Sequence, residues 1–524
     1  MTKEKTINYS TVRASSYIAI SLPLFVFAIG WLKWYWAVLV CAGLFLVVYK
    51  CIRTAKIENR DEIIKLSRVG IAAIAGIILV WVWLSGTGGF WAQSEDYPYR
   101  NAIFRDIILR KWPVIYEQTG HALVYYIGFW LVPALFGKTA LLLGASDGLA
   151  FNVGNVAVFI WTFLLLYLLF LHLIFKINTK TQKEQILIVL LFIFFGGMDI
   201  WGKVGAIRYS NFHLEWWAKY YQYSSFTTDL FWVFNQAIPG WLCFALLLNE
   251  KRINNYVFIG MMCLFCAPIP FVGLFVYAVV IGISKAINTI KTKTGKEYWK
   301  DVVSLPNLIS VFIFFPIIAT YTLSNTAIHG TGNFQLAESS ISEAAAANIV
   351  SMGDESLIQR YFSFICIEFL LYMICIWFKY KQDLLYYVTL VSLLIIPLIK
   401  IGEGFDFAMR ASIPGLLMLF ILIVSYLFEE THVLKKKGSI QRMTYILLVI
   451  LLCFGAVTPG MEIFRGCRQV CLNGIRTEGE DNIYTLGCDG PYDEPGKNVT
   501  YANFVATDLE NQIFFRVFCK NKEK

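Results

Sequence analysis

The sequence predicts an all-α, polytopic helical membrane protein with about 13 transmembrane helices. Of its 524 residues, 57% are hydrophobic and 15% are charged, whereas soluble proteins average about 45–50% and about 25%. The apolar residues gather in more than a dozen runs of about 17–24 residues, which is the length of a helix that crosses a hydrocarbon core of ~30 Å. This pattern excludes a soluble enzyme and a disordered chain.

Hydropathy places the predicted spans in order along the chain. They cover residues 16–32, 35–51, 69–87, 153–175, 185–200, 225–248, 255–267, 268–285, 303–322, 357–378, 383–400, 409–428 and 440–457. The first apolar run is too long for a cleavable signal peptide and lacks a small-residue cleavage site, so we interpret it as the first span.

The distribution of basic residues predicts the orientation in the cell membrane. The first 16 residues and the segments 50–68, 176–183, 251–252, 285–300, 379–381 and 435–442 carry more than twice as many Lys and Arg as the alternating loops. The positive-inside rule places this basic set in the cytoplasm, with the N-terminus inside and the C-terminus outside. The net charge of +9 has the same origin, so we expect no nucleic-acid partner.

This orientation requires that the apolar stretch 121–150 does not cross the membrane. Pro133, Gly137 and Gly144 interrupt it, and we expect re-entrant or interfacial helices there. The predicted transmembrane domain is then 1–457, with extracytoplasmic loops 88–152, 199–224 and 323–356. A small extracytoplasmic tail follows at 458–524.

Four cysteines fall in the predicted tail. They are Cys467, Cys471, Cys488 and Cys519. An even number of cysteines in an extracytoplasmic segment is typical of disulfides, so we expect two bridges whose pairing stays open. The spacing CRQVC also resembles a pair of metal ligands, but no His pair follows it, and we expect no metal site there.

The first candidate segment for function is the acidic and basic stretch after residue 88. Glu95 and Asp96 precede Tyr97-Pro98, where proline favours the first turn of a helix. An apolar stripe follows and predicts a short amphipathic helix on the membrane surface. Arg100 and Arg105 suit a phosphate or diphosphate. The alternatives are that the carboxylates complement a helix N-terminus and that the arginines attract lipid headgroups.

Two further outer segments carry polar residues among aromatic ones. The segment 199–229 contains His213, Glu215 and Asp229; its aromatic residues are typical of an interface belt or of a surface that packs against a sugar ring. The segment 400–410 ends with Asp406 and Arg410. No nucleotide-binding, metalloprotease or serine-hydrolase motif is present, so soluble-cofactor chemistry is not expected.

An acidic pair in a large outer loop, a surface helix, many spans and an outer tail together resemble the GT-C superfamily of polytopic glycosyltransferases. Members transfer sugars from polyprenyl-phosphate donors and place a catalytic carboxylate in the first extracytoplasmic loop. The matching residues are Glu95 and Asp96 in SEDYPYR, although here this loop follows the third span. The resemblance covers the topology of about the first 290 residues and implies a GT-C-like fold.

The resemblance also implies a mechanism. Cationic side chains stabilise the leaving phosphate, with Arg100, Arg105 and Arg410 as candidates. A carboxylate acts as general base on the acceptor hydroxyl, with Asp96 first and Glu95 second. The partners would be the lipid-linked sugar, membrane lipids and a glycan, lipid or protein acceptor, and a divalent cation is possible. The alternative is a flippase, transporter or polymerase for lipid-linked glycans.

Overall fold

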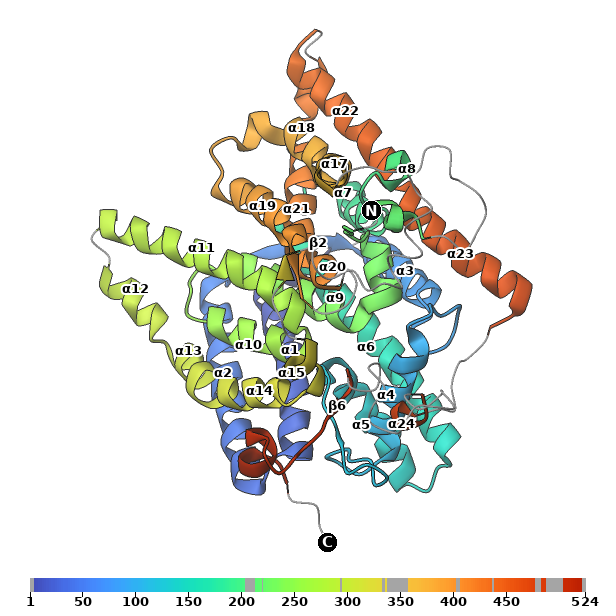
Figure 1. The fold of residues 1–524 in the computed structure, drawn as a ribbon. Helices are drawn as coiled ribbons and strands as arrows, with labels where there is room; N and C mark the ends of the chain where they lie inside the picture. Colours follow the sequence, from blue (N-terminus) through green and yellow to red (C-terminus); the bar gives the residue numbers. More distant parts are fainter. Residues whose placement is uncertain are drawn as a thin grey trace.

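The computed structural model describes residues 4–202, 213–218, 220–292, 295–331, 335–336, 357–401, 406–435, 438–475, 482–486 and 503–520 (Figure 1). Cys488 lies outside these ranges, as do Arg208, Lys219 and Glu403 of the outer segments 199–229 and 400–410. The described chain is nearly all helical. The all-α prediction is therefore confirmed.

The first half of the chain begins with a long helical hairpin, α1 and α2. In order, the helices are α1 (Tyr9–Trp31), α2 (Trp34–Glu58), α3 (Arg68–Leu84), α4 (Tyr97–Leu109), α5 (Gly128–Leu142), α6 (Asp147–Lys176), α7 (Gln182–Ile193), α8 (Asp199–Gly202), η1 (Leu214–Ala218), α9 (Phe226–Leu248) and α10 (Tyr256–Cys266). Several of these helices begin at a polar capping residue: the Asn8, Ser67 and Ser225 side chains accept hydrogen bonds from backbone N–H groups in the first turn. Backbone N–H groups in the first turn have no carbonyl partner within the helix, so the capping side chains satisfy them.

The second half contains more interrupted helices. They are α11 (Pro268–Thr292), α12 (Gly295–Val302), α13 (Leu305–Ile309), η2 (Ser310–Phe314), α14 (Phe315–Leu323), α15 (Thr326–Thr331), α17 (Leu357–Ile365), η3 (Cys366–Leu370), α18 (Leu371–Tyr380), α19 (Leu384–Ile395), η4 (Ile396–Leu398), α20 (Asp406–Ala411), α21 (Ile413–Glu429), η5 (Thr431–Lys435), α22 (Ile440–Gly455), α23 (Val457–Asn473), α24 (Ile483–Leu486) and η6 (Phe514–Phe518).

Within the described ranges, eight helices are long and apolar enough to cross a membrane. They begin at Tyr9, Trp34, Asp147, Phe226, Pro268, Gly295, Leu357 and Ile440, and five further apolar helices are shorter. These helices indicate a multi-pass membrane protein. The finer expectation of 13 crossings stays a prediction, because several of the predicted spans form helices of fewer than 18 residues.

Several of the segments predicted to be cytoplasmic meet at one end of the molecule. Strands β1 (Glu4–Asn8) and β2 (Ile63–Ser67) pair antiparallel there. The Gln185 side chain donates to the Lys65 carbonyl at 2.9 Å, and Lys251 pairs with Glu62 at 2.7 Å. Lys285 donates to the Lys251 carbonyl at 2.9 Å. The basic segments at the N-terminus and at 50–68, 251–252 and 285–300 therefore share one end of the fold.

The stretch 121–150 forms α5 and the start of α6, so helices are present where they were expected. The two helices make a hairpin whose turn contains Gly144, at φ +89°, a backbone conformation that favours glycine. Helix α4 packs into this hairpin: a Cβ at Gly154 would lie 2.5 Å from Cδ1 of Ile108. The predicted amphipathic helix therefore exists, but its apolar face is buried on α5 and α6 instead of lying on lipid.

The predicted tail is divided between two places. Helices α22 and α23 run as one long rod along an edge of the molecule (Figure 1). The last described segment returns to the first hairpin, where the Lys520 N–H donates to the Trp31 carbonyl at 2.8 Å. Strand β6 (Val505–Ala506) pairs with β3 (Ala122–Leu123), and the strands β4 (Gln335–Leu336) and β5 (Ile399–Lys400) form a third pair. The domain boundary at 457 stays a prediction.

The prediction of two disulfides in the tail is wrong. Cys467, Cys471 and Cys519 are free thiols, and each of the three possible pairings of four cysteines would join two of these three. The physical reason lies in their placement. Cys467 and Cys471 are one turn apart on α23, whereas Cys519 is buried beside Leu32 of the first hairpin.

Candidate functional site: a cavity with two aspartate–arginine pairs

A cavity of ≈ 620 Å³ lies where α4, α20 and the junction of α10 and α11 meet. Its polar lining consists of Asp96, Tyr99, Arg100, Tyr125, Tyr126, Tyr321, Thr322, Asn325, Asp406, Arg410 and Asn503. Its apolar lining consists of Ile103, Val124, Leu264, Phe265, Pro268, Ile269, Ala327, Ile328, Ile401 and Phe504. Its volume falls within the range of about 300–1,000 Å³ typical of small-molecule sites.

The start of α4 holds the first pair of site residues in place. Asp96 precedes the helix and Pro98 occupies its first turn, where a missing N–H costs no helical hydrogen bond. Between them, Tyr97 is buried, donates to the Ser85 carbonyl at 2.9 Å and stacks on Phe234 at 5.6 Å between ring centroids. Burial raises the pKa of Tyr97 to about 12, so it serves as a neutral anchor.

Two ion pairs of the same construction line the cavity. Nη2 of Arg100 lies 2.7 Å from Oδ2 of Asp96, and Nη1 of Arg410 lies 3.1 Å from Oδ2 of Asp406. In both pairs the arginine follows the aspartate by one helical turn. Both guanidinium groups are nearly buried, while both carboxylates are about half exposed. A buried charge is tolerated when it is paired, and these pairs bring both arginines to the cavity wall.

Each arginine of the two pairs retains an N–H group without a partner in the described part of the chain. Nη1 of Arg100 and Nε of Arg410 are buried and have no hydrogen-bond partner among the described residues. Arg410 also donates from Nη1 to the Tyr126 hydroxyl at 3.3 Å, and Arg100 lies over the Phe234 ring at 5.8 Å. A buried N–H without an acceptor costs about 1–3 kcal/mol, so a bound anion would be favoured here.

The two pairs interact across the cavity. Asp406 contributes most to the stabilisation of the Arg410 charge, and Asp96 of the other pair adds a smaller contribution. Segments that are about 300 residues apart in sequence therefore form one electrostatic unit. Sequence analysis named all four charged residues, and the fold brings them together.

Two of the other predicted site residues lie away from the cavity lining. Glu95 is exposed and does not line the cavity. The guanidinium of Arg105 lies over the Phe151 ring at 5.6 Å, on the side of α4 that faces α6. Neither side chain lines the cavity. Of the acidic pair Glu95 and Asp96, only Asp96 therefore belongs to the site.

Glu215 has a different environment from the cavity carboxylates. It is buried and accepts hydrogen bonds from the Ser225 N–H at 2.9 Å, the Ser224 hydroxyl at 2.8 Å and the Gln222 amide at 3.1 Å. Burial and the nearby Asp199 carboxylate raise the pKa of Glu215 to about 8. These contacts hold the segment before α9 in place, which is a structural task.

His213 and Asp229 also lie outside the cavity lining. Nδ1 of His213 is 3.6 Å from Oε1 of Glu462, and its ring stacks on Trp216. Asp229 is fully buried in the first turn of α9, and neither of its carboxylate oxygens has a hydrogen-bond partner among the described residues.

Sequence analysis missed several polar residues of the cavity. Tyr126, Tyr321, Asn325 and Asn503 come from three separate parts of the chain. Asn325 is fixed by its own contacts: its amide donates to the Val124 carbonyl at 2.6 Å and to the Asn503 carbonyl at 2.9 Å. The one available signal was the tyrosine pair in the interrupted stretch 121–150; no local pattern points to Asn325 or Asn503.

Metal ligands are not clustered in the described ranges, where no group of three or more His, Cys, Asp or Glu side chains could hold an ion.

Comparisons of the chain with protein-family models, curated proteins and solved structures find no match. The fold and the cavity therefore define the class, a helical multi-pass membrane protein with a paired arginine–aspartate site, and function has to be argued from that site.

Proposed function

We propose that this protein is a membrane glycosyltransferase of the GT-C kind, which moves a sugar from a polyprenyl-phosphate donor to an extracytoplasmic acceptor. One observation carries the proposal: a single cavity contains two buried arginines with free N–H groups and two half-exposed carboxylates. Phosphate binding and proton removal are the two tasks that such a transfer requires.

The arginines suit the donor phosphate. Arg100 and Arg410 each carry a buried N–H without a partner, and a guanidinium binds phosphate oxygens with charge-assisted hydrogen bonds. Binding of the donor would satisfy both groups.

The remaining lining suits the two ends of a lipid-linked sugar. Leu264, Phe265 and Ile269 supply an apolar wall at the junction of α10 and α11, beside which a prenyl chain would lie. Tyr99 and Tyr125 supply aromatic faces against which a sugar ring would pack. Asn325 supplies polar contacts from a third side.

The chemistry is a single displacement at the anomeric carbon. The acceptor hydroxyl oxygen forms a bond to this carbon while the bond from the carbon to the phosphate oxygen breaks. The electron pair of that bond leaves with polyprenyl phosphate, whose charge Arg100 and Arg410 stabilise. The hydroxyl proton passes to Asp96 as general base, and the anomeric configuration inverts.

A divalent cation has no part in these steps. The cavity carboxylates Asp96 and Asp406 are each engaged with an arginine, which is a poor ligand set for a cation. The positive charge that a metal would bring to the phosphate is supplied by the two guanidinium groups.

The proposed orientation follows the basic loops. Four of the segments rich in Lys and Arg share one end of the fold, and the residues of the cavity belong to segments that alternate with the basic segments along the chain. By the positive-inside rule the cavity opens outside the cell membrane, where a glycan, lipid or protein acceptor would meet the donor. Labelling of cysteines introduced at residues 95 and 298 from each side of sealed vesicles tests this orientation.

The decisive test of the function is transfer by the purified protein. Polyprenyl-phosphate sugars are offered in lipid nanodiscs, and release of polyprenyl phosphate is measured. A transporter or flippase for lipid-linked glycans would instead move the intact donor between leaflets without breaking the bond. Flipping without bond cleavage would replace the proposed function with this alternative.

A further inference from the structure

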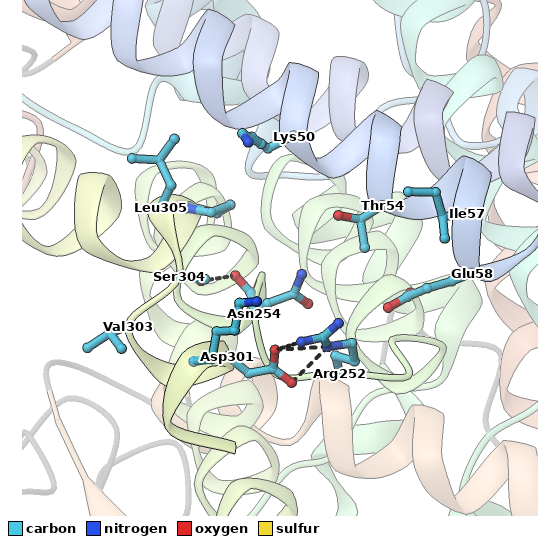
Figure 2. A pocket seen from close by; sticks show the side chains of 12 residues that line it. Lys50, Thr54, Ile57, Glu58, Arg252, Asn254, Asp301, Val303, Ser304 and Leu305 are labelled. Atoms are coloured by element: carbon cyan, nitrogen blue, oxygen red, sulfur yellow. Dashed lines mark hydrogen bonds and ion pairs between the residues drawn. The ribbon is translucent and has the colours of Figure 1, made fainter. Parts of the chain in front are cut away.

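A second cavity, of ≈ 400 Å³, lies at the end of the fold that holds the basic loops. It is lined by three stretches of chain: residues 50–58 of α2, residues 252–254 of the loop before α10, and residues 300–306 at the junction of α12 and α13 (Figure 2). It shares no lining residue with the cavity that contains the two aspartate–arginine pairs. The role of this second cavity therefore requires a separate explanation.

Side-chain contacts fix the floor of this second cavity. Nε of Arg252 lies 2.8 Å and 2.9 Å from the two carboxylate oxygens of Asp301 (Figure 2). The Ser304 hydroxyl donates to the Asn254 carbonyl at 2.5 Å, and the Asn307 amide donates to the Ile253 carbonyl at 3.0 Å. Because these bonds join α12 and α13 to the loop before α10, the cavity is a built feature and not a loose gap between helices.

Two acceptors in the lining lack a donor. Oε1 of Glu58 and Oδ1 of Asn254 are buried, and neither has a hydrogen-bond partner among the described residues. The other carboxylate oxygen of Glu58 accepts from Nη1 of Arg13 at 2.9 Å, which holds the carboxylate in place. A buried acceptor without a donor is costly, so these atoms favour a ligand that brings N–H or O–H groups.

The same lining carries cations that no described carboxylate pairs with. Lys50 on α2 and Lys300 on α12 are exposed, whereas the nearby Asp301 is already engaged with Arg252. Two ammonium groups at one cavity favour an anionic group such as a phosphate. The ligand thus needs a phosphate and a hydrogen-bond donor within one small head group.

The surroundings of this cavity resemble those of a site at the height of lipid headgroups. Ile57, Val303 and Leu305 line it and are 70%, 56% and 41% exposed. Trp299 on α12 is 64% exposed, and tryptophan is enriched at membrane–water interfaces. Apolar side chains that are exposed next to lysines fit the boundary between acyl chains and headgroups.

We propose that this cavity binds the phosphoethanolamine head group of a phospholipid. The ammonium group donates to Oε1 of Glu58 and Oδ1 of Asn254, and the phosphate contacts Lys50 and Lys300. The acyl chains follow the exposed apolar residues Ile57 and Leu305. This inference does not depend on the glycosyltransferase proposal, since it concerns a different cavity with a different ligand.

The first test varies the ligand on the wild-type protein, which avoids any folding defect. Lipid binding is measured by native mass spectrometry with phosphatidylethanolamine, phosphatidylcholine and phosphatidylglycerol of matched chains. Phosphatidylcholine has the same phosphate and charge but no N–H donor, so we expect binding at least about tenfold weaker than that of phosphatidylethanolamine. Equal binding of these two lipids, or stronger binding of phosphatidylglycerol, would overturn the proposal.

The second test varies the protein. The double variant Lys50→Gln/Lys300→Gln should bind phosphatidylethanolamine about 30-fold more weakly. The control Lys56→Gln/Lys296→Gln removes the same charge from the same two helices at exposed positions outside the lining and should bind like wild type. Equal losses from both double variants would mean general surface attraction and would contradict the site.

Two further arms define the donor contact and the source of the head group. Glu58→Gln should weaken the binding of phosphatidylethanolamine more than that of phosphatidylcholine and so reduce the preference between them; a variant that keeps the full preference refutes the contact with Glu58. Free phosphoethanolamine, which lacks the acyl chains, should compete only at far higher concentration than the lipid. Competition at equal concentration would identify a soluble ligand instead of a lipid.

Discussion

Nη2 of Arg100 lies 2.7 Å from Oδ2 of Asp96, yet the two side chains differ in exposure: the arginine is 9% exposed and the aspartate 47%. The guanidinium is held within the protein, while the carboxylate opens toward the cavity. An acceptor hydroxyl can therefore reach Asp96 without displacing Arg100. This division of one ion pair into a buried cation and an accessible base underlies the proposed transfer.

The variant Arg410→Lys tests the phosphate contact. Lysine keeps the positive charge but lacks the planar guanidinium group, including the Nε–H that in Arg410 has no partner among the described residues. Donor binding should therefore weaken about 10–100-fold. Titration of the purified protein with a polyprenyl-phosphate sugar measures the dissociation constant. Arg105→Lys is the matched control, because Arg105 lies over Phe151 and outside the cavity; the phosphate contact is refuted if both variants bind the donor alike.

Packing of α4 into the α5–α6 hairpin gives a prediction for stability. Gly154→Ala would place a methyl group 2.5 Å from Cδ1 of Ile108, and such overpacking typically costs about 1–3 kcal/mol. Because Ile108 belongs to the helix that carries Arg100, donor binding should weaken as well. Thermal unfolding and donor titration measure the two effects.

The control for this packing prediction lies on the same helix. A Cβ at Gly148 would meet nothing within 4 Å, so Gly148→Ala should be neutral or slightly stabilising, as alanine favours helices more than glycine. If Gly154→Ala is as stable as Gly148→Ala, α4 does not pack on α6 as described.

Glu215 predicts a pH dependence of stability. Burial and Asp199 raise the pKa of Glu215 from 4.5 to about 8 in the folded protein, so the folded state holds this proton more tightly than the unfolded state. Its contribution to stability is fully present below pH 4.5 and is lost as the pH rises through about 8, at no more than about 1.4 kcal/mol per pH unit. The unfolding midpoint should therefore fall over this window.

The variant Glu215→Gln isolates that contribution. It should flatten the fall of the unfolding midpoint between pH 5 and 8, because glutamine does not titrate. Glu95→Gln, at an exposed position, should leave the slope of wild type unchanged. An identical slope in wild type and Glu215→Gln would show that Glu215 is not a buried acid in the folded protein.

The free cysteines predict a labelling pattern. Cys471 is exposed and should react with an alkylating reagent in unreduced protein within minutes. Cys519 is buried, and burial raises its pKa to about 12, so little reactive thiolate is present and labelling should be slower by orders of magnitude. Peptide mapping by mass spectrometry separates the two sites; labelling of Cys471 only after reduction would restore a disulfide there.

Much of the fold could be predicted because apolar run length and helix formation are linked in a membrane protein. Every predicted span contains a helix, from α1 at Tyr9–Trp31 to α22 at Ile440–Gly455. The burial of α4 could not be predicted, because an apolar helix face looks the same in sequence whether it meets lipid or protein. The small residues Gly137 and Gly154, which admit α4, were the only local sign.

The candidate site could be predicted in part. Asp96, Arg100, Asp406 and Arg410 were identifiable because charge is rare and expensive near an apolar span. Their assembly into one cavity depends on how distant helices pack, which no single segment encodes. The same holds for Asn503, which reaches the cavity because the last part of the chain returns to β3, and for the disulfides, where cysteine number alone misled.

The most direct test of the central claim is transfer from a polyprenyl-phosphate sugar by wild type and by Asp96→Asn, side by side in nanodiscs. Asparagine keeps the size of the side chain but does not accept the acceptor proton. Release of polyprenyl phosphate should therefore fall about 10²–10⁴-fold, with donor binding retained. Glu95→Gln, whose side chain does not line the cavity, should transfer like wild type. If wild type turns over and Asp96→Asn matches it, Asp96 is not the base; if wild type binds no polyprenyl-linked donor, the glycosyltransferase proposal is wrong.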